Sequence, residues 1–328
     1  MNGRFLIMYR FNKVSDAYSE ARKYNKYEST APFPPYVTIE LQNDCNFKCT
    51  MCSLTYQDEQ PEQFGLRKLK QVIDEIAEYG SMVRFIGYCE PLMYSQIREA
   101  VTYVKSKGLL LHMTTNGSML NKEMSDFLVE AGLDSIIFSF QGASKDEYLT
   151  MRNLGGPIYE RVIDNIKYFH SIRKNTEMKI TTTVTERDTK GEIEAFVATH
   201  SAYVDEVQIS GFTHFVHVSD HFGEQHVWGN YGINRPQLKD RVKCFLPNFE
   251  MLIKPNGDVC ACCGAYTDGL VYGNVIDDQL IDIWRGGRAE KLRTKICGGE
   301  LEELENCRVC PVRYKYANID NAVHNTRK

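Results

Sequence analysis

The sequence has no excess of basic residues, because 39 lysines and arginines stand against 43 aspartates and glutamates. A protein that binds nucleic acid or an anionic membrane through its overall charge needs a basic excess, so neither partner is expected. No apolar run approaches the ~20 residues of a membrane-spanning helix. The start of the chain lacks the apolar core and cleavage site of a secretory signal. These absences favour a cytoplasmic protein.

Cysteine is the residue type that stands out, with 11 in 328 residues. Disulfides are typical of oxidising compartments and small secreted domains, so a large chain without an export signal favours metal or redox chemistry. The cysteines are clustered rather than scattered. They are Cys45, Cys49 and Cys52 near the start, Cys89 alone, and Cys244, Cys260, Cys262, Cys263, Cys297, Cys307 and Cys310 after a long gap.

The body of the sequence alternates compact apolar segments with segments whose apolar residues recur every three to four positions, typical of strands and amphipathic helices respectively. Six such units predict a parallel sheet, either a nearly closed barrel or an open doubly wound sheet. In both folds, the loops after the carboxyl ends of the strands carry the chemistry. The predicted strands are Tyr36–Leu41, Met82–Ile86, Leu109–Met113, Ser135–Phe140, Ile180–Val184 and Val204–Ile209.

The first cysteine cluster lies in the loop that follows the first predicted strand. Cys45, Cys49 and Cys52 have the spacing C-x3-C-x2-C. A [4Fe-4S] cube needs four ligands, and no fourth cysteine or histidine lies nearby, so one iron would remain open to an external molecule. The alternatives are a structural zinc knuckle or a disulfide pair with one cysteine left over.

This loop resembles that of the radical S-adenosylmethionine (SAM) enzymes. The resemblance extends to a Glu-Pro motif at Glu90 after the second strand and to an Asn-Gly turn at Asn116 after the third. It implies a partial (β/α)6 TIM-like barrel in which the three cysteines hold a [4Fe-4S] cluster, SAM binds its open iron, and a 5'-deoxyadenosyl radical removes hydrogen from substrate. SAM contacts are implied for Glu90, Asn116, Ser139, Gln141, Arg152 and Met51.

Two positions depart from the family pattern. Met51 stands where an aromatic residue usually packs on the adenine, a role that methionine can also fill. Cys89 stands where glycine usually precedes the glutamate. We interpret Cys89 as a small buried residue rather than a functional thiol.

The second constellation lies in the C-terminal part, where Asn256–Gly257 between two short apolar segments predicts a hairpin. The helix that follows it is predicted to run from residue 280 to about 296. Such a small unit buries little surface, so a bound metal or cluster would supply stability. Four thiolates suit a closed [4Fe-4S] or zinc site. The layout resembles the SPASM/twitch branch of the radical SAM enzymes, and the spacing is similar to that of the 2-deoxy-scyllo-inosamine dehydrogenases. The implied ligands are Cys244, Cys262, Cys307 and Cys310.

Four cysteines are left over, and Cys263 is the informative one. If Cys262 points to the cluster, Cys263 points the other way. It could donate a hydrogen atom, as in radical SAM epimerases, act as an alternative ligand, or simply pack. Cys260 shares the parity of Cys262, and Cys297 is interpreted as structural.

The sequence predicts four segments: an N-terminal extension over residues 1–35, the partial barrel over 36–210, a bridging segment over 211–243, and a small α+β domain of hairpin plus helix with the auxiliary iron–sulfur site over 244–328. The bridging segment is rich in histidine, a residue that titrates near neutral pH. His214 and His217 are therefore candidate general bases, with a polar surface linker as the plainer alternative.

These observations predict a radical SAM oxidoreductase with two [4Fe-4S] clusters that oxidises an alcohol of a small polyol, sugar or aminocyclitol to a ketone. The alternatives are an epimerase that uses Cys263, and a maturase that modifies a peptide. A non-catalytic cluster scaffold would need neither the open three-cysteine site nor Glu90 and Arg152. The resemblance implies a reducing partner such as a flavodoxin or ferredoxin.

Overall fold

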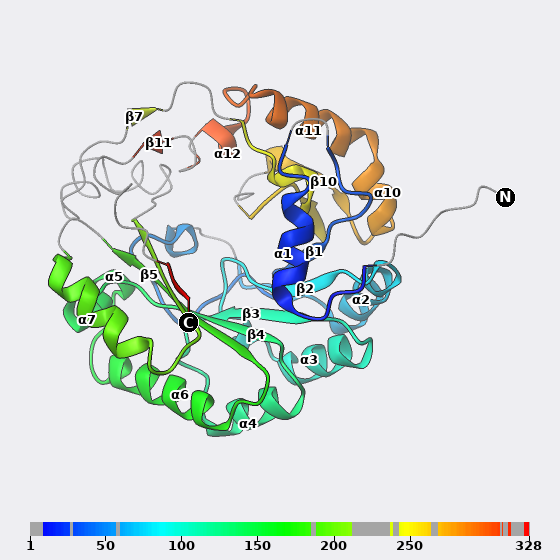
Figure 1. Cartoon of the computed structure of the whole chain (residues 1–328). Coiled ribbons are helices and arrows are strands. Elements are labelled where there is room, and N and C mark those ends of the chain that lie inside the picture. Colours follow the sequence, from blue (N-terminus) through cyan, green and yellow to red (C-terminus); the bar gives the residue numbers. More distant parts are fainter. Residues whose placement is uncertain are drawn as a thin grey trace. The chain divides into compact units, whose positions relative to one another are not determined.

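The computed structural model describes residues 9–26, 29–56, 60–184, 188–211, 237–238, 243–263, 268–308, 310, 314–315 and 325–327. The chain forms two compact units, each assembled from separate stretches of sequence. Figure 1 labels their helices and strands. The first comprises Met1–Asn43, Pro61–Met113 and Arg241–Arg308, and the second comprises Asp44–Gln60, Thr114–Asp240 and Val309–Lys328. This division does not test the four sequence-based segments, which stay a prediction.

The first unit is built on parallel strands separated by amphipathic helices. Strand β1 (Tyr36–Ile39) pairs in parallel with β2 (Met82–Phe85), and β2 pairs in parallel with the start of β3 (Leu111–Thr115). Helices α2 (Leu66–Tyr79) and α3 (Ile97–Ser106) connect these strands. Helix α2 buries its apolar stripe, and it ends at Gly80, whose φ of 68° favours glycine.

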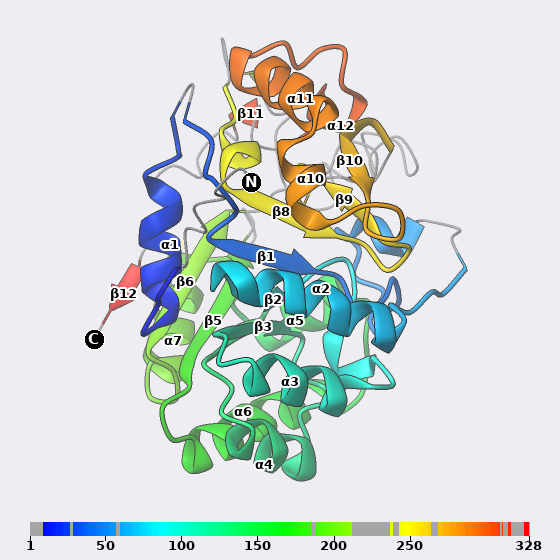
Figure 2. The ribbon, with the colours of Figure 1, turned by 90° about the vertical axis from the view of Figure 1, so that its right-hand side faces the viewer.

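The C-terminal part of the first unit extends the same sheet on the other side of β1. Strand β8 (Glu250–Ile253) pairs in parallel with β1, and β9 (Asp258–Cys260) and β10 (Val271–Asn274) follow as antiparallel strands. Figure 2 shows β1 between β8 and β2. The sequence predicts the β8–β9 hairpin, which the structure confirms, but not the pairing of β8 with β1.

Helices α10 (Leu280–Arg285), α11 (Gly287–Gly298) and α12 (Glu305–Arg308) follow β10. The single helix predicted from residue 280 to about 296 is wrong in one respect, because the chain breaks at Gly286, whose ψ of 153° is extended. The indole of Trp284 donates to the Ala31 carbonyl at 2.9 Å, which ties α10 to the segment before β1.

A buried ion pair joins β2 and β8 across β1. The Arg84 guanidinium lies 2.9 Å from the Glu250 carboxylate, donates to the Thr38 hydroxyl, and stacks 4.0 Å from the centre of the Tyr36 ring. Helix α1 (Val14–Arg22) brings Tyr18 against Tyr36 with ring centres 5.4 Å apart. The sheet of the first unit therefore buries charged side chains that are satisfied by one another.

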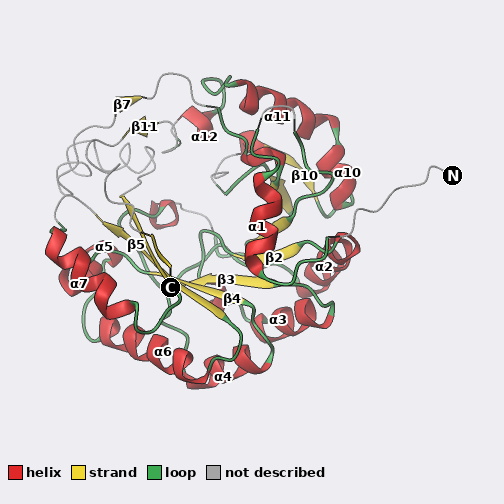
Figure 3. Cartoon of the chain, viewed as in Figure 1, coloured by secondary structure: helices red, strands yellow, loops and turns green. Residues whose placement is uncertain are grey.

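The second unit contains β4 (Ser135–Ser139), β5 (Glu177–Val184) and β6 (Glu206–Gly211), which are parallel, and β12 (Asn325–Arg327), which is antiparallel to β6. Figure 3 shows helices α4 (Lys122–Glu130), α6 (Ile158–Ile172) and α7 (Lys190–His200) along one side of these strands. Helix α5 (Lys145–Arg152) follows β4. The unit also holds the short helix η1 (Ser53–Tyr56) and the two-residue strands β7 (Gln237–Leu238) and β11 (Tyr314–Lys315).

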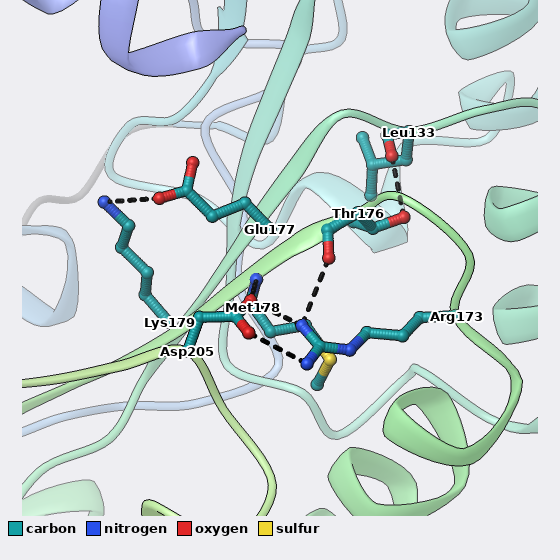
Figure 4. A network of polar contacts seen from close by, with 7 residues as sticks. All are labelled: Leu133, Arg173, Thr176, Glu177, Met178, Lys179 and Asp205. Carbon is teal, nitrogen blue, oxygen red and sulfur yellow. Dashed lines mark hydrogen bonds and ion pairs between the residues drawn. The ribbon is translucent and has the colours of Figure 1, made fainter. Parts of the chain in front are cut away.

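A polar network joins the loops that precede β5 and β6 (Figure 4). Arg173, just after α6, donates to the carboxylate of Asp205 and to the Thr176 carbonyl. Asp205 also accepts from the Met178 amide at 2.8 Å. Burial opposes charge on Asp205, but these hydrogen bonds outweigh it and lower the pKa of the carboxyl. The network fixes the end of the unit that lies away from the carboxyl ends of the strands.

Candidate functional site

The loop that carries the first three cysteines is organised by short-range hydrogen bonds. The Asp44 carboxylate accepts from the Cys45 amide at 2.8 Å, and the Cys52 amide donates to the Cys49 carbonyl at 3.1 Å. Helix η1 starts directly after Cys52. Cys49 is buried, and Cys45 and Cys52 are half-buried. Burial and the neighbouring Cys49 raise the pKa of the Cys52 thiol to about 11, so binding to iron would have to displace its proton.

Arg152, the last residue of α5, lies against this loop. One guanidinium nitrogen is 3.3 Å from the Cys49 sulfur, and another donates to the carbonyl of Ser139 at the end of β4. The Thr50 amide donates to the Met151 carbonyl at 3.0 Å. Burial would lower the pKa of Arg152, but attraction to Cys49 and Tyr148 outweighs it and the pKa is raised. Arg152 therefore places a permanent positive charge beside the thiols.

The turn after β3 reaches the same loop through Asn116. Its amide nitrogen donates to the Asn46 side chain at 2.9 Å and lies 3.8 Å from the Cys45 sulfur, and its carbonyl oxygen accepts from the Ser118 amide. Gly117 has a φ of 76°, which favours glycine. The turn thus holds the Asn116 amide beside Cys45.

Unpartnered buried atoms at this site fit an additional polar molecule. The amide nitrogen of Gln141 lies 3.4 Å from the Ser139 hydroxyl, while its buried carbonyl oxygen has no hydrogen-bond partner in the part of the chain that the structure describes. The same holds for the ε nitrogen of Arg152. Two sets of contacts meet at this loop. Arg152 contacts Cys49 and Ser139, and Gln141 lies beside Ser139, while Asn116 lies beside Cys45. Met51, in the same loop, is half-buried.

Glu90 lies in the first unit, after β2. Its side chain is 1% exposed and accepts from the Leu92 amide at 3.2 Å, which caps the short helix η2 (Pro91–Met93). The Gln42 amide donates to the Glu90 carbonyl at 2.8 Å. The Tyr88 amide donates to the buried Glu40 carboxylate, and a Cβ on Gly87 would lie 2.3 Å from Glu40. A side chain at position 87 would therefore displace Glu40.

The C-terminal cysteines differ in exposure. The four predicted ligands Cys244, Cys262, Cys307 and Cys310 are half-buried, Cys260 is buried and Cys263 is exposed. Cys89 is half-buried, and Cys297 is buried with its thiol 3.5 Å from the Asn248 side chain. In the described ranges no three His, Cys, Asp or Glu side chains are placed to hold one metal ion. The thiolates of a cube bind different irons, so that result concerns single ions such as zinc.

The ligand and SAM-contact assignments stay predictions, and His214 and His217 lie outside the described residues. The aromatic support of Arg152 is not evident from the sequence: its guanidinium lies 5.5 Å from the Phe47 ring centre and 5.7 Å from that of Tyr148. Helix α5 is short and mostly polar, so its apolar periodicity gives little signal.

Comparison with protein families identifies the class. The model of the radical SAM superfamily matches residues 39–199, and that of the SPASM iron–sulfur cluster-binding domain matches residues 244–311. The chain is a radical SAM enzyme. It belongs to the SPASM/twitch branch of that superfamily, which confirms the predicted partial (β/α)6 barrel with a small C-terminal iron–sulfur domain. The cofactors are SAM, a [4Fe-4S] cluster and auxiliary iron–sulfur.

Solved structures share this fold at low sequence identity. BtrN in complex with AdoMet and 2-DOIA is 14% identical with a TM-score of 0.56, covering 85% of this chain and 93% of BtrN. SuiB of Streptococcus suis bound to precursor peptide SuiA is 15% identical with a TM-score of 0.62, covering 91% of this chain and 73% of SuiB. These likenesses show the fold alone.

Among curated proteins, the Fe-coproporphyrin III synthase of Methanosarcina barkeri is 31% identical over 33% of this chain and 27% of the synthase. The chain spans less than half the length of this and several other curated relatives. Separately, none of the helices in the described ranges is both long enough and apolar enough to cross a membrane.

Proposed function

We propose that the chain is a radical SAM oxidoreductase that oxidises an alcohol of a small polyol, sugar or aminocyclitol to a ketone. The observation that supports this most is the match to nearly the whole of BtrN, a 2-deoxy-scyllo-inosamine dehydrogenase, whereas about a quarter of SuiB has no counterpart. The four C-terminal cysteines at the spacing of such dehydrogenases point the same way.

Different residues of the second unit would bind the cluster and SAM. Cys45, Cys49 and Cys52 would hold the cluster, and together with SAM bound at its open iron the cluster would supply a carbon radical that abstracts hydrogen. Arg152 holds Cys49 and offers its unpartnered ε nitrogen to an anion such as the SAM carboxylate. Gln141 offers its unpartnered carbonyl oxygen to a hydroxyl or amine.

Oxidation of an alcohol to a ketone removes two electrons and two protons. One electron and one proton leave together as a hydrogen atom, and the second proton and the second electron leave separately. The hydrogen atom leaves from carbon, and a base takes the hydroxyl proton, for which His214 and His217 are the candidates. Cys244, Cys262, Cys307 and Cys310 would hold the auxiliary iron–sulfur site, which would accept the remaining electron. An external reductant such as a ferredoxin or flavodoxin supplies the electron that starts each cycle.

The test is anaerobic turnover with SAM, a reductant and a panel of polyols, sugars and aminocyclitols. We expect a ketone and one 5'-deoxyadenosine per ketone, from protein that contains about eight irons per chain. Cys45→Ala should abolish both products, while Cys297→Ala, which removes a thiol outside the proposed ligand sets, should retain them. About four irons per chain, or no ketone from any member of the panel, contradicts the proposal.

Epimerisation is a second candidate because Cys263 is the exposed cysteine of the eleven. A thiol that faces solvent can approach a substrate carbon, give it a hydrogen atom on the opposite face, and be restored by one electron and one proton. Cys263→Ala should then stop formation of the inverted product while 5'-deoxyadenosine still forms. Unchanged stereochemistry and turnover in this variant would remove the epimerase reading.

Peptide modification is the third candidate, favoured by the likeness to SuiB, which was solved with a precursor peptide. The neighbouring genes would distinguish a small-molecule substrate from a peptide substrate. Sugar-modifying enzymes support the small-molecule substrate, and a short precursor-peptide gene supports the maturase.

A further inference from the structure

The sulfur of Cys45 receives hydrogen bonds from a main-chain donor and from a side-chain donor. The Phe47 amide nitrogen lies 3.4 Å from this sulfur, and the side-chain nitrogen of Asn116 lies 3.8 Å from it. Sulfur is larger than oxygen, so hydrogen bonds to it are correspondingly longer. Asn116 is 6% exposed, so little water competes with its amide. A substitution at Asn116 therefore removes one donor and leaves the other in place.

The orientation of the Asn116 amide is fixed by Ser118. The main-chain N–H of Ser118 can only donate, and it donates to the Asn116 side-chain oxygen at 2.9 Å. The Ser118 hydroxyl donates to the same oxygen at 2.6 Å. The nitrogen of Asn116 is therefore the end that meets the Asn46 side-chain oxygen, at 2.9 Å, and the Cys45 sulfur. Asn116 is thus held as a donor to Cys45.

Three side chains close a ring of hydrogen bonds beside Cys45. The Asn46 side-chain nitrogen donates to the Ser118 hydroxyl at 2.8 Å, Ser118 donates to Asn116, and Asn116 donates back to Asn46. Each member is both a donor and an acceptor, so each bond polarises the next. Asn46 lies between the first two cysteines and Ser118 lies in the turn after β3. The ring therefore joins the cysteine loop to that turn.

The turn that carries Asn116 is itself anchored on both sides. The side-chain nitrogen of Asn165 in α6 donates to the Gly117 carbonyl at 2.9 Å, and the Gly117 amide donates to the Thr115 hydroxyl at 3.0 Å. The cysteine loop, the turn and α6 all belong to the second unit. The distance from Asn116 to Cys45 is therefore set within one compact unit.

We infer that Asn116, with Ser118 as its positioning residue, donates a hydrogen bond to the Cys45 sulfur of the SAM-binding cluster and makes that cluster easier to reduce. The cause is electrostatic, because reduction adds negative charge to a cluster and its thiolates, and a donor to a ligand sulfur stabilises that charge. The effect falls on the electron transfer that starts each cycle. The inference rests on the proposed function only in that Cys45 holds this cluster, and not on the substrate.

Asn116→Ala tests the donor. The full-length, cluster-loaded protein is titrated anaerobically with a reductant, without SAM, and followed by electron paramagnetic resonance. The signal that disappears when Cys45, Cys49 and Cys52 are replaced by alanine belongs to the SAM-binding cluster. We expect the equilibrium constant for its reduction to fall about tenfold in Asn116→Ala, which is ~59 mV for one electron. Ser118→Ala should cause a smaller fall, because the main-chain amide of residue 118 still orients Asn116.

Asn165→Ala is the matched control, since it removes an asparagine amide that anchors the same turn through the Gly117 carbonyl. It should leave the potential unchanged. A second measurement uses protein labelled with ¹⁵N in the side-chain amides of asparagine. Pulsed electron paramagnetic resonance should show a ¹⁵N nucleus coupled to the reduced SAM-binding cluster in the wild type and in Asn165→Ala, and not in Asn116→Ala.

A wild-type potential in Asn116→Ala, or the same ¹⁵N coupling with and without Asn116, overturns the inference. An equal shift in Asn165→Ala also overturns it, because the effect would then come from a loosened turn. An unchanged potential in Ser118→Ala removes the positioning role of that residue. The outcome is separable from the proposed function, since ketone formation with an unshifted potential refutes the hydrogen bond alone. A shifted potential in a protein that forms no ketone refutes the substrate proposal alone.

Discussion

Acidification should weaken the second unit through His200, the last residue of α7. The side chain is 3% exposed and packs on Phe196 and Phe140, with ring centres 4.2 and 5.4 Å away. Burial, with a smaller contribution from the nearby Lys167 charge, lowers the pKa of His200 to about 4. Neutral imidazole fits this apolar site, whereas imidazolium would be a buried charge.

The sign follows from the unfolded pKa of about 6.5. Because the folded pKa is lower, the unfolded chain binds the proton first as pH falls, and the folded state loses stability from pH 6.5 down to about pH 4. A shift of about 2.5 units corresponds to about 3 kcal/mol in total. Roughly 2 kcal/mol of this should be gone by pH 5.

The protonation of His200 also affects the cysteine loop, because the aromatic rings that pack on His200 extend to Arg152. The Phe140 ring lies 4.5 Å from that of Tyr148, and Tyr148 lies under the Arg152 guanidinium. Protonation of His200 therefore disturbs the packing behind the residue that contacts Cys49. We expect SAM binding to the folded protein to weaken only as the pH approaches about 4, where the folded-state imidazole gains its proton.

Two measurements test this reasoning. The His200 ring resonances, assigned by comparison with His200→Phe, should not titrate between pH 8 and pH 5. The urea midpoint of the wild type should fall across this range more steeply than that of His200→Phe, which keeps an aromatic ring but has no titratable group. A His200 ring that titrates near pH 6.5, or equal pH dependence in the two proteins, would refute the argument.

Three further predictions follow from packing and charge. Arg84→Met should destabilise the protein by about 3–5 kcal/mol because it leaves Glu250 buried and unpaired, and Arg84→Met/Glu250→Leu should recover most of the loss in urea unfolding. Gly87→Ala should cost about 1–3 kcal/mol by displacing Glu40, whereas Gly155→Ala, with nothing within 4 Å of the added Cβ, should be neutral. Arg152→Lys should raise the Kd for SAM at least tenfold in calorimetry, while Arg161→Lys at an exposed position should not; equal affinity in the two variants would show that Arg152 does not hold SAM.

The sequence predicts best what is encoded locally. The stripe of apolar residues on α2 and the compact strands β1 and β2 are visible because each pattern repeats within a single element. The break at Gly286 is missed because both flanking segments keep a helical pattern. Strand β10 is missed because a bulged four-residue strand has little periodicity.

Long-range contacts are the part that periodicity does not encode. Strand β8 pairs with β1, and Arg84 of β2 forms an ion pair with Glu250 of β8. The pattern of residues within each of these strands does not indicate which distant segment it will contact. At the cysteine loop the sequence supplies residue types and spacing, and a family resemblance supplies Arg152. The contact between Arg152 and Cys49 depends on where α5 ends, which its weak periodicity does not fix.

The parallel pairing of β1 with β8 has a consequence for how the protein is made. Tyr36 and Glu250 face each other across this pair and are 214 residues apart, so the ribosome needs roughly 10–40 s to travel from one to the other. During that interval one edge of β1 has exposed backbone groups that can pair with another chain. Chaperone cover during that interval should therefore raise the yield of soluble protein, whereas slower elongation, which prolongs the exposure of the edge, should lower it.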